Sequence, residues 1–126
     1  MILLNFSHPL TEAQQQAIVQ QVGRPIADMR EVKTQLDVDA PFQDQIVALL
    51  DGLNISSADW QSQPWLIVLP SLNYAAAVLL AELHGRMGHF PTIVRLRPQA
   101  NSLVTAYELA EIINLEGVRQ LARIRR

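Results

Sequence analysis

Two residues that can do chemistry, Ser7 and His8, stand where an apolar run ends in the opening stretch MILLNFSHPLTEAQQQ. A histidine can act as a general acid or base near neutral pH, whereas a serine hydroxyl needs a base to become a nucleophile. No cysteine, aspartate or glutamate lies between Asn5 and Leu10 to activate the serine or orient the histidine. A catalytic Ser/His pair therefore has little support, and a turn beside Pro9 explains both residues equally well.

A second polar junction, Pro70–Tyr74 (PSLNY), follows the apolar run WLIVL at 65–69. Ser71–Asn73 can begin a helix here, as Thr11 can after the first junction. Helix N-termini carry unpaired N–H groups and a partial positive charge, so they receive anions. The two junctions are therefore candidate anion-binding loops.

The side chains in these loops suit a nucleotide-like ligand. Ser7, Ser71 and Asn73 supply hydrogen-bond donors, and the rings of Phe6 and Tyr74 offer surfaces on which a base can lie. The alternative is that the residues that begin each helix are ordinary caps. Either loop alone favours capping, whereas two such loops on one sheet edge make a binding site equally reasonable.

Arginine supplies nine of the ten basic residues, and its planar fork suits phosphates and carboxylates. Arg95 and Arg97 are two apart in a predicted strand and so share a face. With Arg86 they can form a phosphate clamp, or they are the solvated face of an edge strand. A further basic cluster near residue 126 can simply complement a helix dipole; it contains Arg119, Arg123, Arg125 and Arg126.

Several classes of protein are disfavoured. The chain has no cysteine, no P-loop and no G-x-G-x-x-G motif, and its net charge of −2 argues against binding long nucleic acid. His84 and His89 lack an adjacent carboxylate cluster, so we expect no metal and no cofactor. No apolar window is long enough for a membrane helix, and MILLNF lacks a basic leader. We expect a soluble cytoplasmic protein without membrane contact.

The hydrophobic pattern alternates between strands and helices along the chain. Thr11 and Gln14 have capping-box spacing, and Asn114 can cap the last helix. Gly85 and Gly88 are expected to break the third helix, and 57–64 is expected to be a polar connection. The predicted strands are 2–6, 30–37, 65–69, 91–98 and 106–113, and the predicted helices are 11–23, 40–54, 72–89 and 115–126.

This alternation predicts a single α/β domain over 1–126 with a Rossmann-like, mostly parallel sheet. Helices should cover both faces, and the last two strands should form an antiparallel edge hairpin. Ligands of such sheets bind outside the carboxyl ends of the strands. Because the first and third strands are usually neighbours in this topology, the two polar loops should meet on one edge.

Three blocks resemble a known family: NFSHPLT, LLAELHGRMGHFPTIVRLRP and YELAEIINLEGVRQLARIRR. They are similar to a small stand-alone CRISPR-associated family, the fifteen-numbered "x" subtype found beside type III CRISPR operons. The resemblance covers nearly the whole chain, and the middle block is its most specific part. It implies a CARF-like, Rossmann-related homodimer that recognises a cyclic oligoadenylate second messenger, cyclic tetra-adenylate, and it leaves open a higher assembly on ligand binding.

By position, the resemblance implies that the ligand loops are 5–11 and 70–74, with Arg97 as a further contact. The implied ligand-binding residues are Asn5, Phe6, Ser7, His8, Thr11, Pro70, Ser71, Leu72, Asn73, Tyr74 and Arg97.

Relatives either cleave the ring or hold it. Cleavage by the ribose 2′-OH needs in-line geometry and a cation or donor at the phosphate, for which Ser7 and His8 are the candidates. Because the loops lack a lysine and His8 has no evident partner, we favour a protein that sequesters the ring. A metal-independent ring nuclease is the first alternative. A non-enzymatic interaction module, using the apolar helix after Pro70, is the second.

Overall fold

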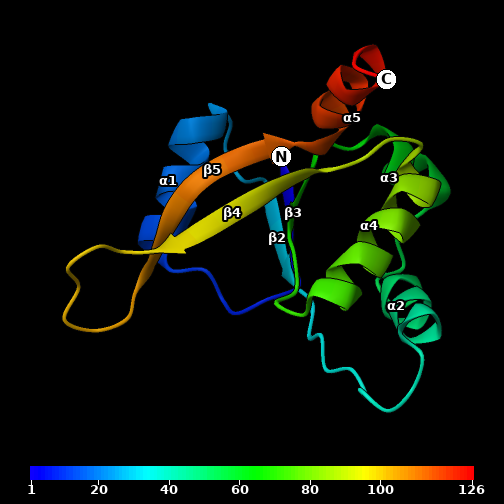
Figure 1. The fold of residues 1–126 in the computed structure, drawn as a ribbon, viewed down its shortest axis with the longest axis horizontal. Helices are drawn as coiled ribbons and strands as arrows, with labels where there is room; N and C mark the ends of the chain where they lie inside the picture. The colour runs from blue at the N-terminus through cyan, green and yellow to red at the C-terminus, as the bar shows by residue number, and fades with distance from the viewer.

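The computed structural model describes residues 1–126, which form one five-stranded sheet (Figure 1). Its strands are β1 (Ile2–Asn5), β2 (Asp28–Glu31), β3 (Trp65–Val68), β4 (Thr92–Pro98) and β5 (Tyr107–Asn114). The strand order is β2-β1-β3-β4-β5, with all neighbours parallel except β4 and β5. The predicted Rossmann-like sheet with an antiparallel edge hairpin is confirmed, as is the adjacency of the first and third strands.

Helices cover both faces of the sheet. They are α1 (Glu12–Val22), α2 (Phe42–Asp51), α3 (Ser57–Ser62), α4 (Asn73–Met87) and α5 (Leu115–Ile124). Figure 1 shows α1 on one side and α2, α3 and α4 together on the other. Leu3 packs with Ile18 of α1, whereas Leu4 packs with Leu79 of α4, so β1 is buried on both faces. This explains why the apolar runs of the central strands do not alternate with polar residues.

The expected helix caps are present. The Thr11 Oγ1 accepts a hydrogen bond from Gln14 N at 3.2 Å, and Gln14 Oε1 accepts one from Thr11 N at 2.9 Å, which is the predicted capping box. At the start of α5, Asn114 Oδ1 accepts a hydrogen bond from Gly117 N at 3.1 Å. Local sequence therefore fixes where the first and last helices begin.

The predicted bounds of the second strand, 30–37, are wrong. β2 comprises only the four residues Asp28–Glu31, of which Asp28 pairs with Ile2 and Glu31 with Asn5. An edge strand receives hydrogen bonds from one side only, and this one carries charged residues, so its hydrophobic pattern is weak. The segment after Glu31 is a connection at the carboxyl end of the sheet.

Two further expectations about helices are corrected. The predicted polar connection contains the short helix α3, which Ser56 caps and the buried Trp60 anchors to the core. Gly85 does not break α4, because a helical glycine costs only about 1 kcal/mol and the buried Leu83 and Met87 hold that turn. The helix ends at Gly88, whose φ of 83° is left-handed.

Candidate functional site: a groove at the carboxyl edge of the sheet

The two polar loops leave the sheet side by side. Asn5 pairs with Val68 in register, and Phe6 N donates a hydrogen bond to Val68 O at 2.9 Å. Beyond these strand ends lies an open groove of about 450 Å³ that contains Ser7 and Ser71, as the topology predicts. Its lining comes from the ends of β1, β2 and β3 and consists of Phe6, Ser7, His8, Pro9, Lys33, Thr34, Gln35, Pro70, Ser71 and Leu72.

Asn5 lies beneath the groove and shapes the first loop. Its side chain is fully buried; Nδ2 donates to His8 O at 2.8 Å, and Oδ1 accepts from Ser7 N at 2.9 Å. The amide thereby satisfies two backbone groups of the turn. Predicted as a ligand contact, Asn5 is in this structure a positioning residue that presents Ser7 and His8 to solvent.

Phe6 differs from the expectation of an exposed ring. It is only 2 % exposed and packs in the core against Leu4 and Ile67, so its ring has no free face for a base. Residues 3–6 are all buried, and the chain turns outward only at Ser7. Tyr74, by contrast, is 73 % exposed in the first turn of α4 and keeps a ring surface available.

Ser7 and His8 are exposed in the groove, and the side chain of neither residue forms a hydrogen bond within the protein. Their only fixed contacts are the backbone bonds to Asn5. An unpartnered serine hydroxyl is not activated, and an unpartnered imidazole is not held in one orientation. The geometry agrees with the sequence in giving no support to a nucleophilic Ser/His pair.

Lys33 is the functional residue that sequence reasoning missed. It is the one lysine in these 126 residues, and it lines the groove together with Ser7 and Ser71 without an ion pair to any carboxylate. Lys33 was missed because it fell inside the predicted strand 30–37, and a residue within that strand would not reach the carboxyl edge of the sheet. Since β2 ends at Glu31, Lys33 belongs to the third loop at the same edge.

The start of α4 adds partial positive charge beside the groove. Leu72 is the N-cap residue and no side chain caps the helix, so the expectation that Ser71 is a cap is wrong. Asn73 Oδ1 accepts a hydrogen bond from its neighbour Tyr74 N at 2.9 Å. The N–H of the exposed Asn73 has no side-chain partner and is available to water or an anion, whereas Ala75 in the same turn is fully buried.

Thr11 and Arg97 lie outside the groove. Thr11 lines a separate hollow of about 420 Å³ between α1 and the β4–β5 hairpin, where its hydroxyl serves the capping box. Arg97 Nε lies 3.3 Å from Glu108 Oε1, and Arg95 Nε lies 3.5 Å from Glu111 Oε1. A register shift after Arg95 brings Glu108 opposite Arg97, whereas Arg95 faces Glu111 before the shift. β4 lies between β3 and β5 and is not an edge strand, but the two ion pairs favour a solvated strand face over a phosphate clamp.

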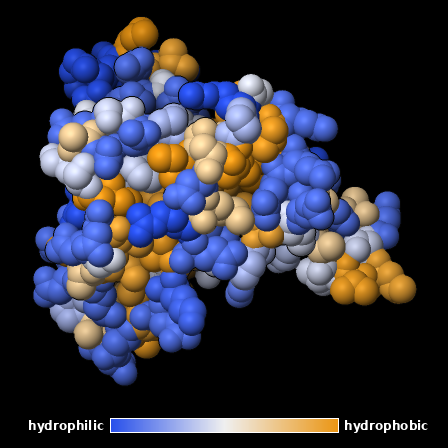
Figure 2. All heavy atoms as spheres, turned by 180° about the vertical axis from the view of Figure 1, so that it is seen from behind, coloured by the Kyte–Doolittle hydropathy of each residue, from blue (hydrophilic) through white to orange (hydrophobic).

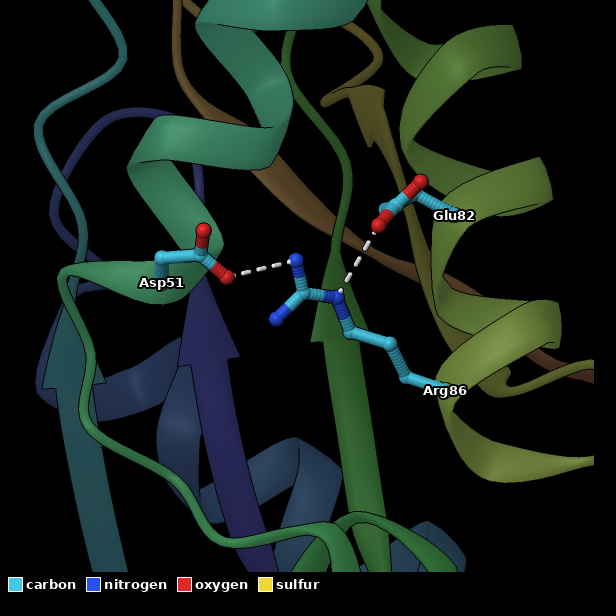
Figure 3. A network of polar contacts seen from close by, with 3 residues as sticks. All are labelled: Asp51, Glu82 and Arg86. Carbon is cyan, nitrogen blue, oxygen red and sulfur yellow. Dashed lines mark hydrogen bonds and ion pairs between the residues drawn. The ribbon is translucent and has the colours of Figure 1, made fainter.

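Arg86, the third member of the considered clamp, is also occupied. Its Nη2 lies 2.8 Å from Asp51 Oδ1 and its Nε lies 3.1 Å from Glu82 Oε1, and the three side chains converge between α2 and α4 (Figure 3). All three arginines are thus neutralised by carboxylates. The positive charge available at the groove is that of Lys33 and the start of α4.

No group of three or more histidine, aspartate or glutamate side chains is arranged to hold a metal ion. No helix has both the length and the apolar character needed to cross a membrane. The chain matches no family model, no curated protein and no solved structure. The family resemblance of the sequence therefore stays a prediction.

Proposed function

We propose that two copies of this groove bind one cyclic tetra-adenylate ring in the cytoplasm and hold it, which lowers the concentration of the free messenger. The observation that carries the proposal is the composition of the groove. Ser7, Lys33 and Ser71 share one rim beside the uncapped start of α4, and no carboxylate lines the groove. Such a site is complementary to phosphate and not to a cation.

The symmetry of the ligand supports a dimer. A ring of four nucleotides carries four phosphates and can adopt twofold symmetry, so a twofold pair of protomers presents every donor twice. One groove holds one lysine and one helix start, which is a modest amount of positive charge for a tetra-anion. Tyr74, exposed in the first turn of α4 although it is not one of the residues that line the groove, supplies a ring surface for an adenine in place of Phe6.

Holding is favoured over cutting because nothing in the groove fixes a catalytic geometry. Cleavage requires the 2′-OH to attack the adjacent phosphorus in line with the departing 5′ oxygen, which yields a 2′,3′-cyclic phosphate. His8 and Ser7 have no partner that orients them. The presence of Lys33 favours the ring-nuclease alternative to the extent that its ammonium can stabilise charge on the phosphate.

The interaction-module alternative loses its main support. It relied on an apolar surface of α4, but Ala75, Leu79, Leu83 and Met87 of that helix are buried in the protein's own core. The apolar side of α4 therefore accounts for folding and is not left for a partner.

Calorimetric titration with rings of three, four and six adenylates tests the proposal. We expect heat with the four-membered ring at half a ring per protomer, and uncleaved ring in the chromatogram after long incubation. If Lys33→Gln and the wild type gave equal heat, the groove would not be the binding site. Linear di-adenylate formed over many turnovers would show that the protein cleaves the ring and does not merely hold it.

A further inference from the structure

A row of arginines runs along one side of α5. Arg119 and Arg123 are four residues apart in α5 and share a face, and Arg126, two residues past the end of the helix, lines the same shallow surface hollow. At the rise of an α-helix, Arg119 and Arg123 are separated by about 6 Å along the axis. One phosphate is too small to engage the whole row.

The row lies far from the candidate groove in the topology. Asn114 at the end of β5 pairs with Thr92 at the start of β4, and Leu115 N donates to Pro91 O at 3.3 Å. Since β4 is parallel to β3, α5 begins at the amino edge of the sheet, whereas the groove is at the carboxyl edge. No residue of α5 is buried, and Figure 1 shows the helix extending outward from the body.

The charge on this helix is not neutralised as it is elsewhere. Each arginine of the considered clamp has a carboxylate within 3.5 Å, but Arg123 and Arg126 have none, and Arg119 has only Glu116 at 3.4 Å. Residues 117–126 contain four arginines and no acid. In a chain with a net charge of −2, free positive charge is therefore concentrated on one exposed face.

We propose that this arginine row binds the sugar–phosphate backbone of single-stranded nucleic acid. Guanidinium groups form paired hydrogen bonds with phosphate oxygens, and a linear row matches consecutive phosphates of a flexible strand. Val118 and Leu121, each more than half exposed, lie on the other side of α5 by helical spacing and form an apolar strip that does not flank the row. Figure 2 shows strongly hydrophilic atoms next to apolar ones at the end of the molecule that α5 forms.

This inference goes beyond the proposed function and does not depend on it, because the two sites lie on opposite edges. It also differs from the helix-dipole explanation of the cationic cluster. A dipole accounts for positive charge in the last turn, but it does not require Arg119 to continue the same face one turn earlier.

The test is fluorescence anisotropy of a short labelled oligouridylate, measured at several salt concentrations. Uridylate lacks the adenine bases of the proposed ring, and because the groove also fits phosphate, Lys33→Gln measures any contribution of the groove to the signal. We expect the logarithm of the binding constant to fall with the logarithm of salt concentration with a slope of about −2, at about 0.7 per contacted phosphate. Arg123→Gln/Arg126→Gln should reduce the slope by about 1.4 and weaken binding about tenfold at low salt.

Matched variants make the result specific. Arg95→Gln/Arg97→Gln removes the same net charge from carboxylate-paired positions and should leave the slope unchanged, as should Lys33→Gln. Arg123→Lys/Arg126→Lys should keep the slope but bind more weakly, because lysine lacks the guanidinium fork. Far-UV circular dichroism checks that α5 is retained in each variant.

Absence of binding by the wild type at low salt overturns the proposal whatever the variants do. Equal slopes for the wild type and for Arg123→Gln/Arg126→Gln overturn it as well. Binding to anionic phospholipid vesicles that Val118→Ser/Leu121→Ser abolishes, without binding to oligouridylate, would assign α5 to a membrane surface instead. Failure of ring binding in the groove would leave all of these outcomes unaffected.

Discussion

The side chain of Asn5 donates a hydrogen bond to the carbonyl of His8 at 2.8 Å from a fully buried position. The same amide accepts the N–H of Ser7, so one side chain at the end of β1 fixes the turn that carries both exposed polar residues of the first loop. The groove depends on this bond for its shape, although Asn5 itself cannot contact a ligand there.

Asn5→Leu should destabilise the fold by about 1–3 kcal/mol, because it leaves the Ser7 N–H and the His8 carbonyl without partners. Urea unfolding followed by circular dichroism measures the change. Ser7→Ala, at an exposed position of the same turn, is the control and should alter stability by less than about 0.5 kcal/mol. Equal stability of Asn5→Leu and the wild type would show that the turn does not need the amide.

Lys33→Gln should weaken ring binding about tenfold to a hundredfold, because a hydrogen bond to a charged group contributes about 1.5–3 kcal/mol. Lys33→Arg should retain most of the affinity. Titration calorimetry measures both. Arg24→Gln, which removes one exposed positive charge at the opposite edge, is the charge-matched control; a loss as large as that of Lys33→Gln would indicate a general charge effect.

His8→Ala separates holding from cutting. If the groove only holds the ring, the variant should bind with an affinity within about 1 kcal/mol of the wild type, and neither protein should release linear product. Chromatography of labelled ring after incubation with each protein is the measurement. A wild type that cuts, and a His8→Ala variant that does not, would make His8 a catalytic residue.

Arg86→Met should destabilise the protein by about 1 kcal/mol or more, because Arg86 joins α2 to α4 through Asp51 and Glu82 and its side chain is only 21 % exposed. Arg97→Gln should cost less than about 0.5 kcal/mol, since the Arg97 side chain is 55 % exposed and its ion pair with Glu108 is screened by salt. Parallel denaturation curves compare them. A larger cost for Arg97→Gln would reverse this order.

Central features of the fold could be predicted because they rest on strong local patterns. The apolar runs of β1 and β3 define strands buried on both faces, and Thr11 and Asn114 are caps whose partners lie three residues away. The meeting of Ser7 and Ser71 followed from topology, since parallel neighbours end at one edge. These predictions needed no knowledge of side-chain packing.

The rest depended on tertiary contacts. Lys33 entered the groove because an edge strand ended early, and edge strands carry weak patterns. The Phe6 side chain packs in the core, and an apolar run in the sequence does not reveal whether its last residue is buried. The short helix α3 could have been recognised from the cap residue Ser56 and the anchor Trp60, but its polar composition resembles a loop.

The pairing of Arg97 with Glu108 depends on a register shift that no local motif indicates, and that of Arg95 with Glu111 depends on the register of the hairpin. The Glu82–Arg86 pair, by contrast, has the four-residue helical spacing that favours an ion pair. Its second carboxylate, Asp51, comes from another helix and could be found only in the folded chain.

Because Lys33 carries the one side-chain primary amine of these residues, a dye that acylates lysine has one side chain among them to which it can attach. A fluorophore attached there would sit inside the groove itself. The molecule thus offers a built-in attachment point through which occupancy of that edge can be followed optically, without the introduction of a cysteine.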